Sequence, residues 1–226
     1  MIYAFYGFVL GFFIPGIARR LAKVLPAAAP EVLWRLITIT KHPSRQKRCQ
    51  SNTYKILAIS YFYRCFIYAL ITGLIFFLAT LHFNAHGLGA ALVFLWSLLL
   101  LLEIDYKTFL LPDIITVPLL IGGFIFAGLY QEWITPPESA IGAAVGYLLP
   151  VISGLLIVKK HPDAFGGGDI KLLAAVGAWI GTEPIIYTTL LSCLLFGLFS
   201  LYTKRRQGAF GPAISIASII VAFYFF

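Results

Sequence analysis

Long apolar stretches separated by short polar segments run along the whole chain. Lipid admits only helices or closed barrels as spanning structures, and these stretches lack the alternating pattern that is typical of barrel strands. We therefore predict helices, most of them close to the roughly 20 residues that cross a bilayer. The predicted segments are residues 2–18, 56–81, 88–104, 113–131, 139–158, 170–181, 185–202 and 210–226.

The composition supports this interpretation. Of the 226 residues, 60% are apolar and 12% are charged, and the mean hydropathy is +0.91. Soluble domains contain about 45–50% apolar and about 25% charged residues, and disordered chains are less hydrophobic still. These values argue against both classes. They predict an all-α polytopic membrane protein with about eight transmembrane helices.

The basic residues are segregated between alternate connections. Nine of the 17 Lys and Arg residues fall in residues 19–55, and all the others except Arg64 lie in or beside the connections after the third, fifth and seventh segments. The connections 82–87, 132–138 and 182–184 contain none. By the positive-inside rule the basic connections are cytoplasmic, so we expect both termini to be extracytoplasmic.

This topology predicts three parts. Residues 1–18 form a first transmembrane helix, which we expect to be retained because no basic segment precedes it. Residues 19–55 form a basic cytoplasmic loop, and residues 56–226 form a core of seven transmembrane helices. The surplus positive charge is explained by topology and by attraction to anionic lipid, so we predict no nucleic-acid partner.

Five of the nine acidic residues lie at predicted cytoplasmic ends of spans. Asp169 follows three glycines and precedes an apolar run, which places it near the start of a helix, where the macrodipole favours a carboxylate. A simple helix cap is an equally good interpretation of this segment alone. The five acids are Glu103, Asp105, Asp113, Asp163 and Asp169.

Two carboxylates from different helices at one membrane depth can share a proton. Asp105 ends an apolar run, and Pro112 favours the start of a new helix soon afterwards. Such a pair supplies a general base and a general acid together, which is the chemistry of aspartic proteases. The spacing leaves open whether Asp105, Asp113 or Glu103 pairs with Asp169.

A proton- or ion-coupled transporter is the main alternative. Transporter carboxylates usually lie near the middle of the bilayer, between broken helices. The longer predicted spans carry no acid in their middles, which favours the protease hypothesis.

The acidic segments resemble a known family. Residues 105–113 resemble the first motif of type IV prepilin peptidases, an aspartate followed eight residues later by the aspartate of a Pro-Asp pair. Residues 166–171 resemble the second motif, GxGD followed by a hydrophobic residue and lysine. Phe210–Gly211–Pro212 is similar to a third feature of the family. The resemblance covers residues 90–226 well and the first 89 loosely.

The resemblance implies an aspartyl endopeptidase that uses no cofactor or metal for this reaction. Its substrates are type IV prepilins or pseudopilins, and it removes their short basic leader after a glycine, at the cytoplasmic face of the bacterial inner membrane. Asp105 and Asp169 correspond to the catalytic pair. The resemblance also leaves open a third hypothesis, in which the chain is a non-catalytic assembly factor of a pilus or secretion machine.

The other motif residues are expected to support the pair. Gly166 and Gly168 would shape the loop that presents Asp169, and Lys171 would hold charge nearby. The remaining residues, which the motifs alone single out, are Pro112, Asp113, Gly211 and Pro212.

The chain departs from the family in its cysteines. Many members also methylate the new N-terminus of the pilin and carry two CxxC pairs in the first cytoplasmic loop. Here residues 19–55 contain Cys49 alone, which cannot build a four-cysteine zinc site. We therefore do not expect N-methyltransferase activity.

Overall fold

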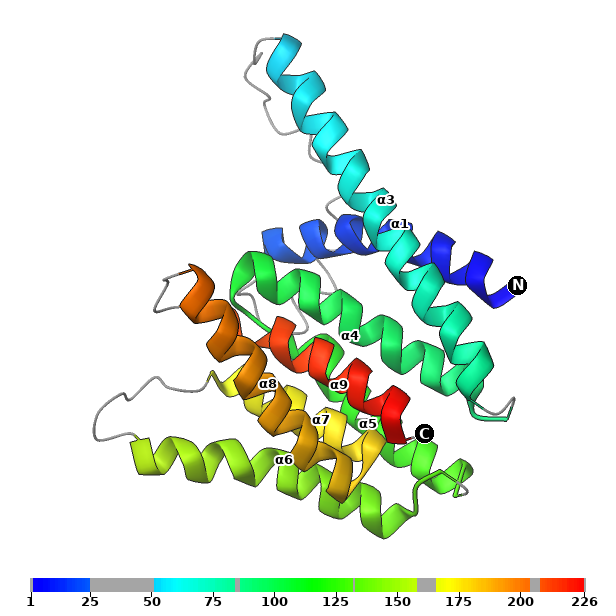
Figure 1. Ribbon diagram of the computed structural model, residues 1–226, viewed down its shortest axis with the longest axis vertical. Coiled ribbons are helices and arrows are strands. Elements are labelled where there is room, and N and C mark those ends of the chain that lie inside the picture. The colour runs from blue at the N-terminus through cyan, green and yellow to red at the C-terminus, as the bar shows by residue number, and fades with distance from the viewer. Residues whose placement is uncertain are drawn as a thin grey trace. The chain divides into compact units, whose positions relative to one another are not determined.

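The computed structural model describes residues 2–24, 51–83, 86–131, 133–157, 166–203 and 208–225, and these ranges contain helices and no strand (Figure 1). Each predicted apolar segment coincides with a helix, so the prediction of an all-α protein is confirmed. The helices are α1 (Ile2–Val24), α3 (Ser51–His82), α4 (Leu88–Thr108), α5 (Asp113–Leu129), α6 (Pro136–Ile157), α7 (Gly167–Ile180), α8 (Thr182–Thr203) and α9 (Gly211–Phe225).

Helix length and composition identify the protein as a multi-pass membrane protein. Among the described residues, α1, α3, α4, α6 and α8 contain five segments long and apolar enough to cross a bilayer. Helices α5 and α9 are apolar but shorter, and α7 has only 14 residues. The predicted orientation of the termini stays a prediction, as does the number of eight crossings.

The chain forms two compact units, Met1–Leu81 and His82–Phe226. In the first unit, α1 and α3 approach closely at two glycines. A Cβ on Gly7 would lie 2.7 Å from the Phe76 ring, and one on Gly11 would lie 2.6 Å from the Tyr68 carbonyl oxygen. Most of the predicted basic loop, residues 25–50, lies outside the described residues, and the proposed division into three parts stays a prediction.

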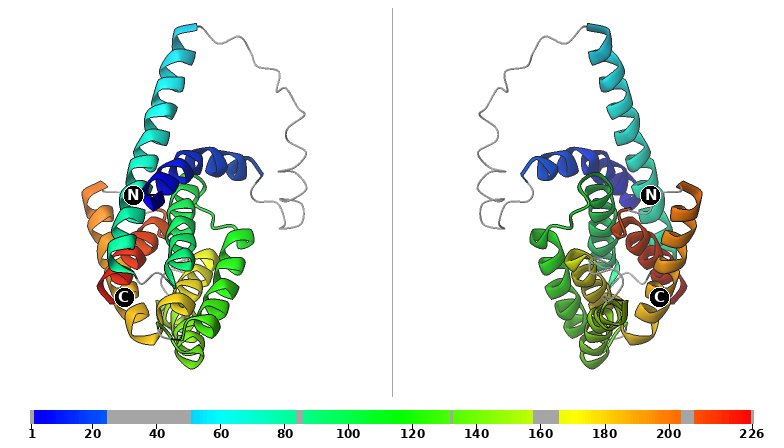
Figure 2. Two further views of the ribbon diagram at one scale, coloured as in Figure 1. Left: turned by 90° about the vertical axis from the view of Figure 1, so that its right-hand side faces the viewer. Right: turned by 90° about the vertical axis from the view of Figure 1, so that its left-hand side faces the viewer.

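Helix α7 is the centre of the second unit, where it packs against α5, α6, α8 and α9 (Figure 2). Its residues from Leu172 to Ile180 are all buried. Glycines let α6 and α7 approach until their backbones touch. A Cβ on Gly142 would overlap the carbonyl oxygen of Gly177, and a Cβ on Gly177 would overlap that of Gly142. This contact fixes the helix that carries Asp169.

Gly177→Ala is expected to destabilise the second unit. The added methyl group has no room against the Gly142 backbone, and overpacking of this kind costs about 1–3 kcal/mol. Thermal unfolding in detergent should show a clear loss for Gly177→Ala. Gly128→Ala is the matched control because a Cβ there meets nothing within 4 Å. Equal melting temperatures for both variants would contradict this account of the packing.

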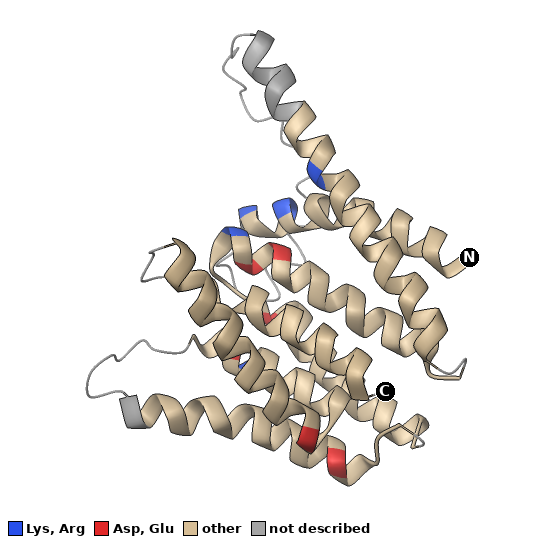
Figure 3. Ribbon diagram, viewed as in Figure 1, with Lys and Arg blue, Asp and Glu red and all other residues tan. Residues whose placement is uncertain are grey.

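Charged residues in the second unit lie at helix ends (Figure 3). Glu103, Asp105 and Lys107 occupy the last two turns of α4, while Asp113 begins α5. Asp169 and Lys171 lie in the first turns of α7. Among the described residues of these helices, the charged side chains that could take part in a reaction therefore lie at the helix ends and not in the apolar middles.

Candidate active site

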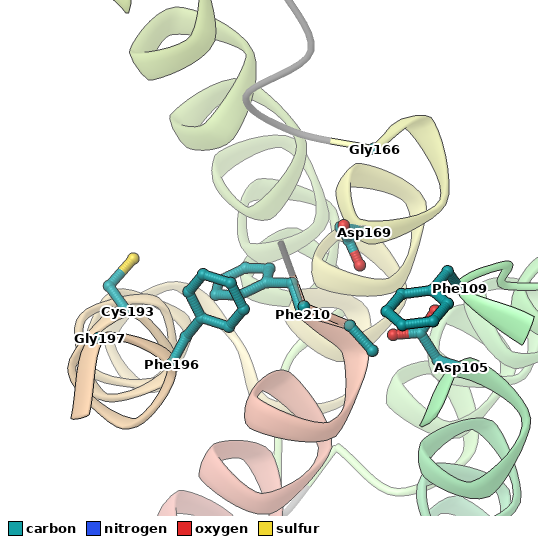
Figure 4. A pocket seen from close by; sticks show the side chains of 10 residues that line it. Asp105, Phe109, Gly166, Asp169, Cys193, Phe196, Gly197 and Phe210 are labelled. Carbon is teal, nitrogen blue, oxygen red and sulfur yellow. The ribbon is translucent and has the colours of Figure 1, made fainter. Parts of the chain in front are cut away.

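A pocket of about 370 Å³ lies in the second unit, where α4 ends and α7 begins (Figure 4). Its wall combines carboxylates, aromatic rings and glycines. Figure 4 shows the carboxyl groups of Asp105 and Asp169 pointing into this space. The lining residues are Asp105, Phe109, Gly166, Asp169, Cys193, Phe196, Gly197, Gly208, Ala209 and Phe210.

Asp105 is buried near the C-terminal end of α4 and is held by the start of α9. The backbone N–H of Gly211 donates a hydrogen bond of 2.9 Å to Asp105 Oδ2. The first N–H groups of a helix have no partner within it, so a carboxylate is a natural acceptor there. A Cβ on Gly211 would lie 2.7 Å from the same oxygen, so only glycine leaves room for the carboxylate.

The chain reverses direction directly after Asp105. Phe109 ends α4 in the left-handed region, with φ of 56°, and its N–H donates to the Asp105 carbonyl at 2.9 Å. Glycine is the usual residue at such a cap, and another residue there costs about 1–2 kcal/mol. Pro112 is the N-cap of α5, so the link between the helices is short. The turn places the Phe109 ring beside the carboxylates.

Asp169 lies in the first turn of α7, two residues after the helix begins. The alternative that Asp169 caps the helix is wrong, because the N-cap is Gly166 and no side chain caps it. The N–H groups of Asp169 and Ile170 donate to the Gly166 carbonyl at 3.0 and 3.3 Å.

The glycines before Asp169 differ in their surroundings. A Cβ on Gly168 would lie 2.9 Å from Leu111 Cβ, so this glycine lets the link after α4 pack against the start of α7. A Cβ on Gly166 would meet only the Asp169 carboxyl group, at 3.1 Å, and one on Gly167 meets nothing within 4 Å. Gly168 is therefore the residue whose small size brings the two aspartate segments together.

Asp169 precedes the apolar stretch of its helix, and its carboxyl group is partly buried. Burial and the neighbouring Asp105 carboxylate raise the pKa of Asp169 to about 7, although the hydrogen bond to the Gly166 backbone acts in the opposite direction. The sequence led us to expect that the helix macrodipole would favour the ionised form of Asp169. Burial and the Asp105 carboxylate instead favour the protonated form. At neutral pH a proton is available within the pair.

The structure answers which acid lies with Asp169. Lys171 Nζ donates to both carboxylate oxygens of Asp113 at 2.8 Å, and this exposed pair joins α7 to α5 outside the pocket. Glu103 is fully buried and forms an ion pair with Lys107, one turn further along α4. Asp105 is thus the acid that shares the pocket with Asp169, and Lys171 neutralises Asp113 rather than the pair.

Two other motif residues act through the backbone. Pro112 is buried before α5, and Pro212 lies in the first turn of α9, where its missing N–H breaks no helical bond. Neither lines the pocket. Asp163 lies outside the described residues.

Sequence reasoning missed most of the pocket wall. Phe109, Cys193, Phe196 and Gly197 carry no signal that separates them from other apolar residues of membrane helices. Phe210 stands beside Gly211 in a motif already quoted, so it could have been included. Within the described residues, no group of three or more His, Cys, Asp or Glu side chains is arranged to hold a metal ion.

Residues 92–201 match the model of the type IV leader peptidase family. This part of the chain belongs to that family. The matched region contains Asp105 and Asp169, together with the three glycines that directly precede Asp169. The leader peptidase region thus supplies both carboxylates of the pocket, whereas Gly211, which binds Asp105, lies beyond it.

Curated relatives carry the name prepilin leader peptidase/N-methyltransferase. One from Aeromonas salmonicida (strain A449) is 37% identical over 144 residues, 59% of this chain and 48% of its own length. One from Dichelobacter nodosus is 34% identical over 166 residues, which are 71% of this chain and 58% of that relative's own length. One from Klebsiella pneumoniae is 40% identical over 126 residues, 54% of each chain. The chain spans about half the length of the curated relatives it matches. No solved structure matches the chain at a significant level.

Proposed function

We propose that this chain is a membrane-embedded aspartyl endopeptidase that removes the short basic leader from type IV prepilins or pseudopilins at the cytoplasmic membrane face. The observation that carries the proposal is the pair of carboxylates that α4 and α7 present to one pocket. The pKa of Asp169, raised to about 7, leaves one member of this pair protonated near neutral pH. Both lie in the region that belongs to the leader peptidase family.

The proposed reaction begins with Asp169 protonated and Asp105 ionised. Asp105 takes a proton from water as the water oxygen bonds to the peptide carbonyl carbon, and Asp169 gives its proton to the carbonyl oxygen. The resulting tetrahedral intermediate breaks its carbon–nitrogen bond. Asp105 then protonates the leaving amine, and a hydroxyl of the intermediate returns a proton to Asp169. Water is added across one peptide bond, and the pair regains its starting state.

The proposal covers the peptidase reaction and not methylation. The names of the relatives include both activities. This sequence holds three cysteines, and no two of them stand within three residues of each other. A structural zinc site commonly needs four ligands from paired cysteines.

Activity is expected to fall as the pH rises above about 7. In that range Asp169 loses the proton that it must give to the carbonyl oxygen, since its folded pKa is about 7. The measurement is kcat/KM for leader removal from about pH 5 to about pH 9. A profile that keeps rising through neutral pH to an alkaline plateau would contradict an acid role for Asp169.

The proposal is tested in bacterial cells that make a prepilin but lack their own leader peptidase. Expression of this chain should convert the prepilin to its shorter mature form, which is visible by gel mobility and mass. Solute flux in proteoliposomes that depends on the aspartates, without any cleavage, would support a transporter instead. Normal assembly of pili with both aspartates replaced would support a non-catalytic factor.

A further inference from the structure

Phe109 combines a strained backbone with an exposed aromatic ring at the edge of the pocket. Its φ of 56° lies in the left-handed region, where a Cβ is crowded by the following carbonyl oxygen. Among the described residues, no other non-glycine residue has a positive φ. Strain of this kind is concentrated at functional sites, where the surrounding structure imposes it. The conformation of Phe109 therefore raises the question of what its side chain does.

Packing does not explain why phenylalanine, and not glycine, occupies this turn. The turn is held by the Thr108 hydroxyl, which donates to the Ile104 carbonyl at 2.9 Å and accepts from the Leu110 N–H at 3.2 Å. The Phe109 backbone adds its hydrogen bond to the Asp105 carbonyl. The Phe109 side chain is 62% exposed, so it contributes little to the packing of the fold.

The ring lies at the carboxylate side of the pocket. Phe109, Asp105 and Asp169 line the same cavity, and Figure 4 shows the ring next to the carboxyl group of Asp105. Asp105 is only 4% exposed although it lines this cavity. An apolar ring in this place occupies space from which water would solvate the carboxylates. We infer that the Phe109 ring screens the carboxylate pair from water, and that the left-handed turn is retained because it holds the ring there.

The inference rests on the proposed function and adds a positioning residue to it. Phe109 exchanges no proton, and it acts through the two carboxyl groups. Screening from water disfavours an ionised carboxylate, and burial is the largest cause of the raised pKa of Asp169. The ring therefore helps the pair to keep its proton at neutral pH, where Asp169 acts as the acid.

Among the described residues, few titratable groups face Asp169. Within the pocket they are Asp105 of α4 and the Cys193 thiol of α8. Asp113 of α5 lies outside the pocket in an exposed ion pair, and Glu103 has its own ion pair within α4. The acids of α6 and α8 lie in the first turns of those helices, at the opposite end of α7, and α9 carries no charged residue. The pKa of Asp169 therefore depends chiefly on Asp105 and on access to water.

Three substitutions of Phe109 separate the ring from the strain. Phe109→Gly removes both, whereas Phe109→Ala removes the ring but keeps a Cβ in the left-handed region. Phe109→Leu keeps apolar bulk beside the carboxylates. Leu110→Ala is the matched control, because Leu110 is exposed in the same turn and does not line the pocket.

In Phe109→Gly and Phe109→Ala, the fall of kcat/KM for leader removal should begin about one pH unit lower than in the unmodified chain. Water that reaches the pair stabilises ionised Asp169, so its pKa falls from about 7 and its proton is lost earlier. A pKa lower by about one unit reduces kcat/KM about fivefold near neutral pH and changes it little at about pH 5. Phe109→Leu should shift the profile less, and Leu110→Ala should not shift it.

Stability should follow the strain and not the ring. Glycine adopts the left-handed conformation without crowding, so Phe109→Gly should melt a few degrees above Phe109→Ala in detergent. The two variants should nevertheless show the same shift of the pH profile. A ring that only packs against the fold or anchors the turn in lipid would leave the profile unchanged in both.

Infrared titration of Asp169 gives a readout that does not depend on turnover. The stretching band of its protonated carboxyl group is assigned by its loss in Asp169→Asn, and it should disappear at lower pH in Phe109→Gly than in the unmodified chain. Unchanged titrations in Phe109→Gly and Phe109→Ala, or an equal shift in Leu110→Ala, would overturn the screening role while leaving the protease in place. If the infrared titration moves but the unmodified chain removes no leader, the proposed function fails and the screening stands.

Discussion

Asp105→Asn and Asp169→Asn are each expected to reduce leader removal by about 10²- to 10⁴-fold. Asparagine keeps the size of the side chain but can neither accept nor return the proton that hydrolysis moves. The two carboxyl groups enter one pocket from α4 and α7, so loss of either leaves the other without its partner. The measurement is the rate of leader removal by each purified variant, with melting temperature as a check on folding.

Glu183→Gln is the control for this pair. It makes the same change of carboxylate to amide in the first turn of α8, where Glu183 is exposed and lines no part of the pocket. Its rate should match that of the unmodified chain. Full activity in either aspartate variant would remove that residue from the proposed mechanism, whatever the other variant does.

Gly211→Ala is expected to reduce activity nearly as much while the protein stays folded. Its methyl group would lie 2.7 Å from Asp105 Oδ2 and 3.0 Å from Asp105 Cβ and Cγ. Either the carboxylate or the start of α9 must then move, which breaks the 2.9 Å hydrogen bond from the Gly211 N–H. We expect a loss of about 10²-fold, since small displacements of catalytic groups have effects of this size.

The useful comparison for Gly211→Ala is Gly89→Ala, which adds the same methyl group in open space at the first turn of α4. The rate of leader removal and the melting temperature should be measured for both. A large loss of rate in Gly211→Ala with a small change in melting temperature supports a positioning role. Unchanged activity in Gly211→Ala would mean that α9 does not hold Asp105 in place.

The helices could be predicted from the sequence because lipid imposes a simple rule on apolar stretches. Every predicted segment coincides with a helix, and the ends differ by a few residues. The largest differences arise where polar residues continue a helix, as at α1, which extends to Val24 instead of ending at residue 18. Hydropathy marks the apolar part of a helix, whereas backbone hydrogen bonding continues into the polar turns beside it.

Helix starts could have been placed better from local chemistry. Thr135 precedes Pro136, and both the N–H and the hydroxyl of Thr135 donate to Glu138, at 3.0 and 2.8 Å. This is the pattern of a capping box with proline in the first turn. It sets the start of α6 at Pro136, three residues before the start that hydropathy predicts.

From the sequence the candidate site could be predicted only as a set of residues, and not as pairs of residues that lie together. Motif spacing singles out Asp105, Asp113 and Asp169, but spacing along a chain does not say which helices pack together. The partner of Asp169 depends on the close contact of Gly168 with Leu111 and on the turn at Phe109. The left-handed backbone at Phe109 could not be expected, because a non-glycine residue rarely adopts it.

The most direct test of the central claim is the reaction of the purified chain with a peptide that carries a basic leader, a glycine and an apolar segment. In water labelled with oxygen-18, mass spectrometry should find one cut after the glycine and one labelled oxygen in the new carboxyl group. Asp105→Asn and Asp169→Asn should leave the peptide intact. An intact peptide with the unmodified chain, or the same cut in both variants, would contradict hydrolysis by this carboxylate pair.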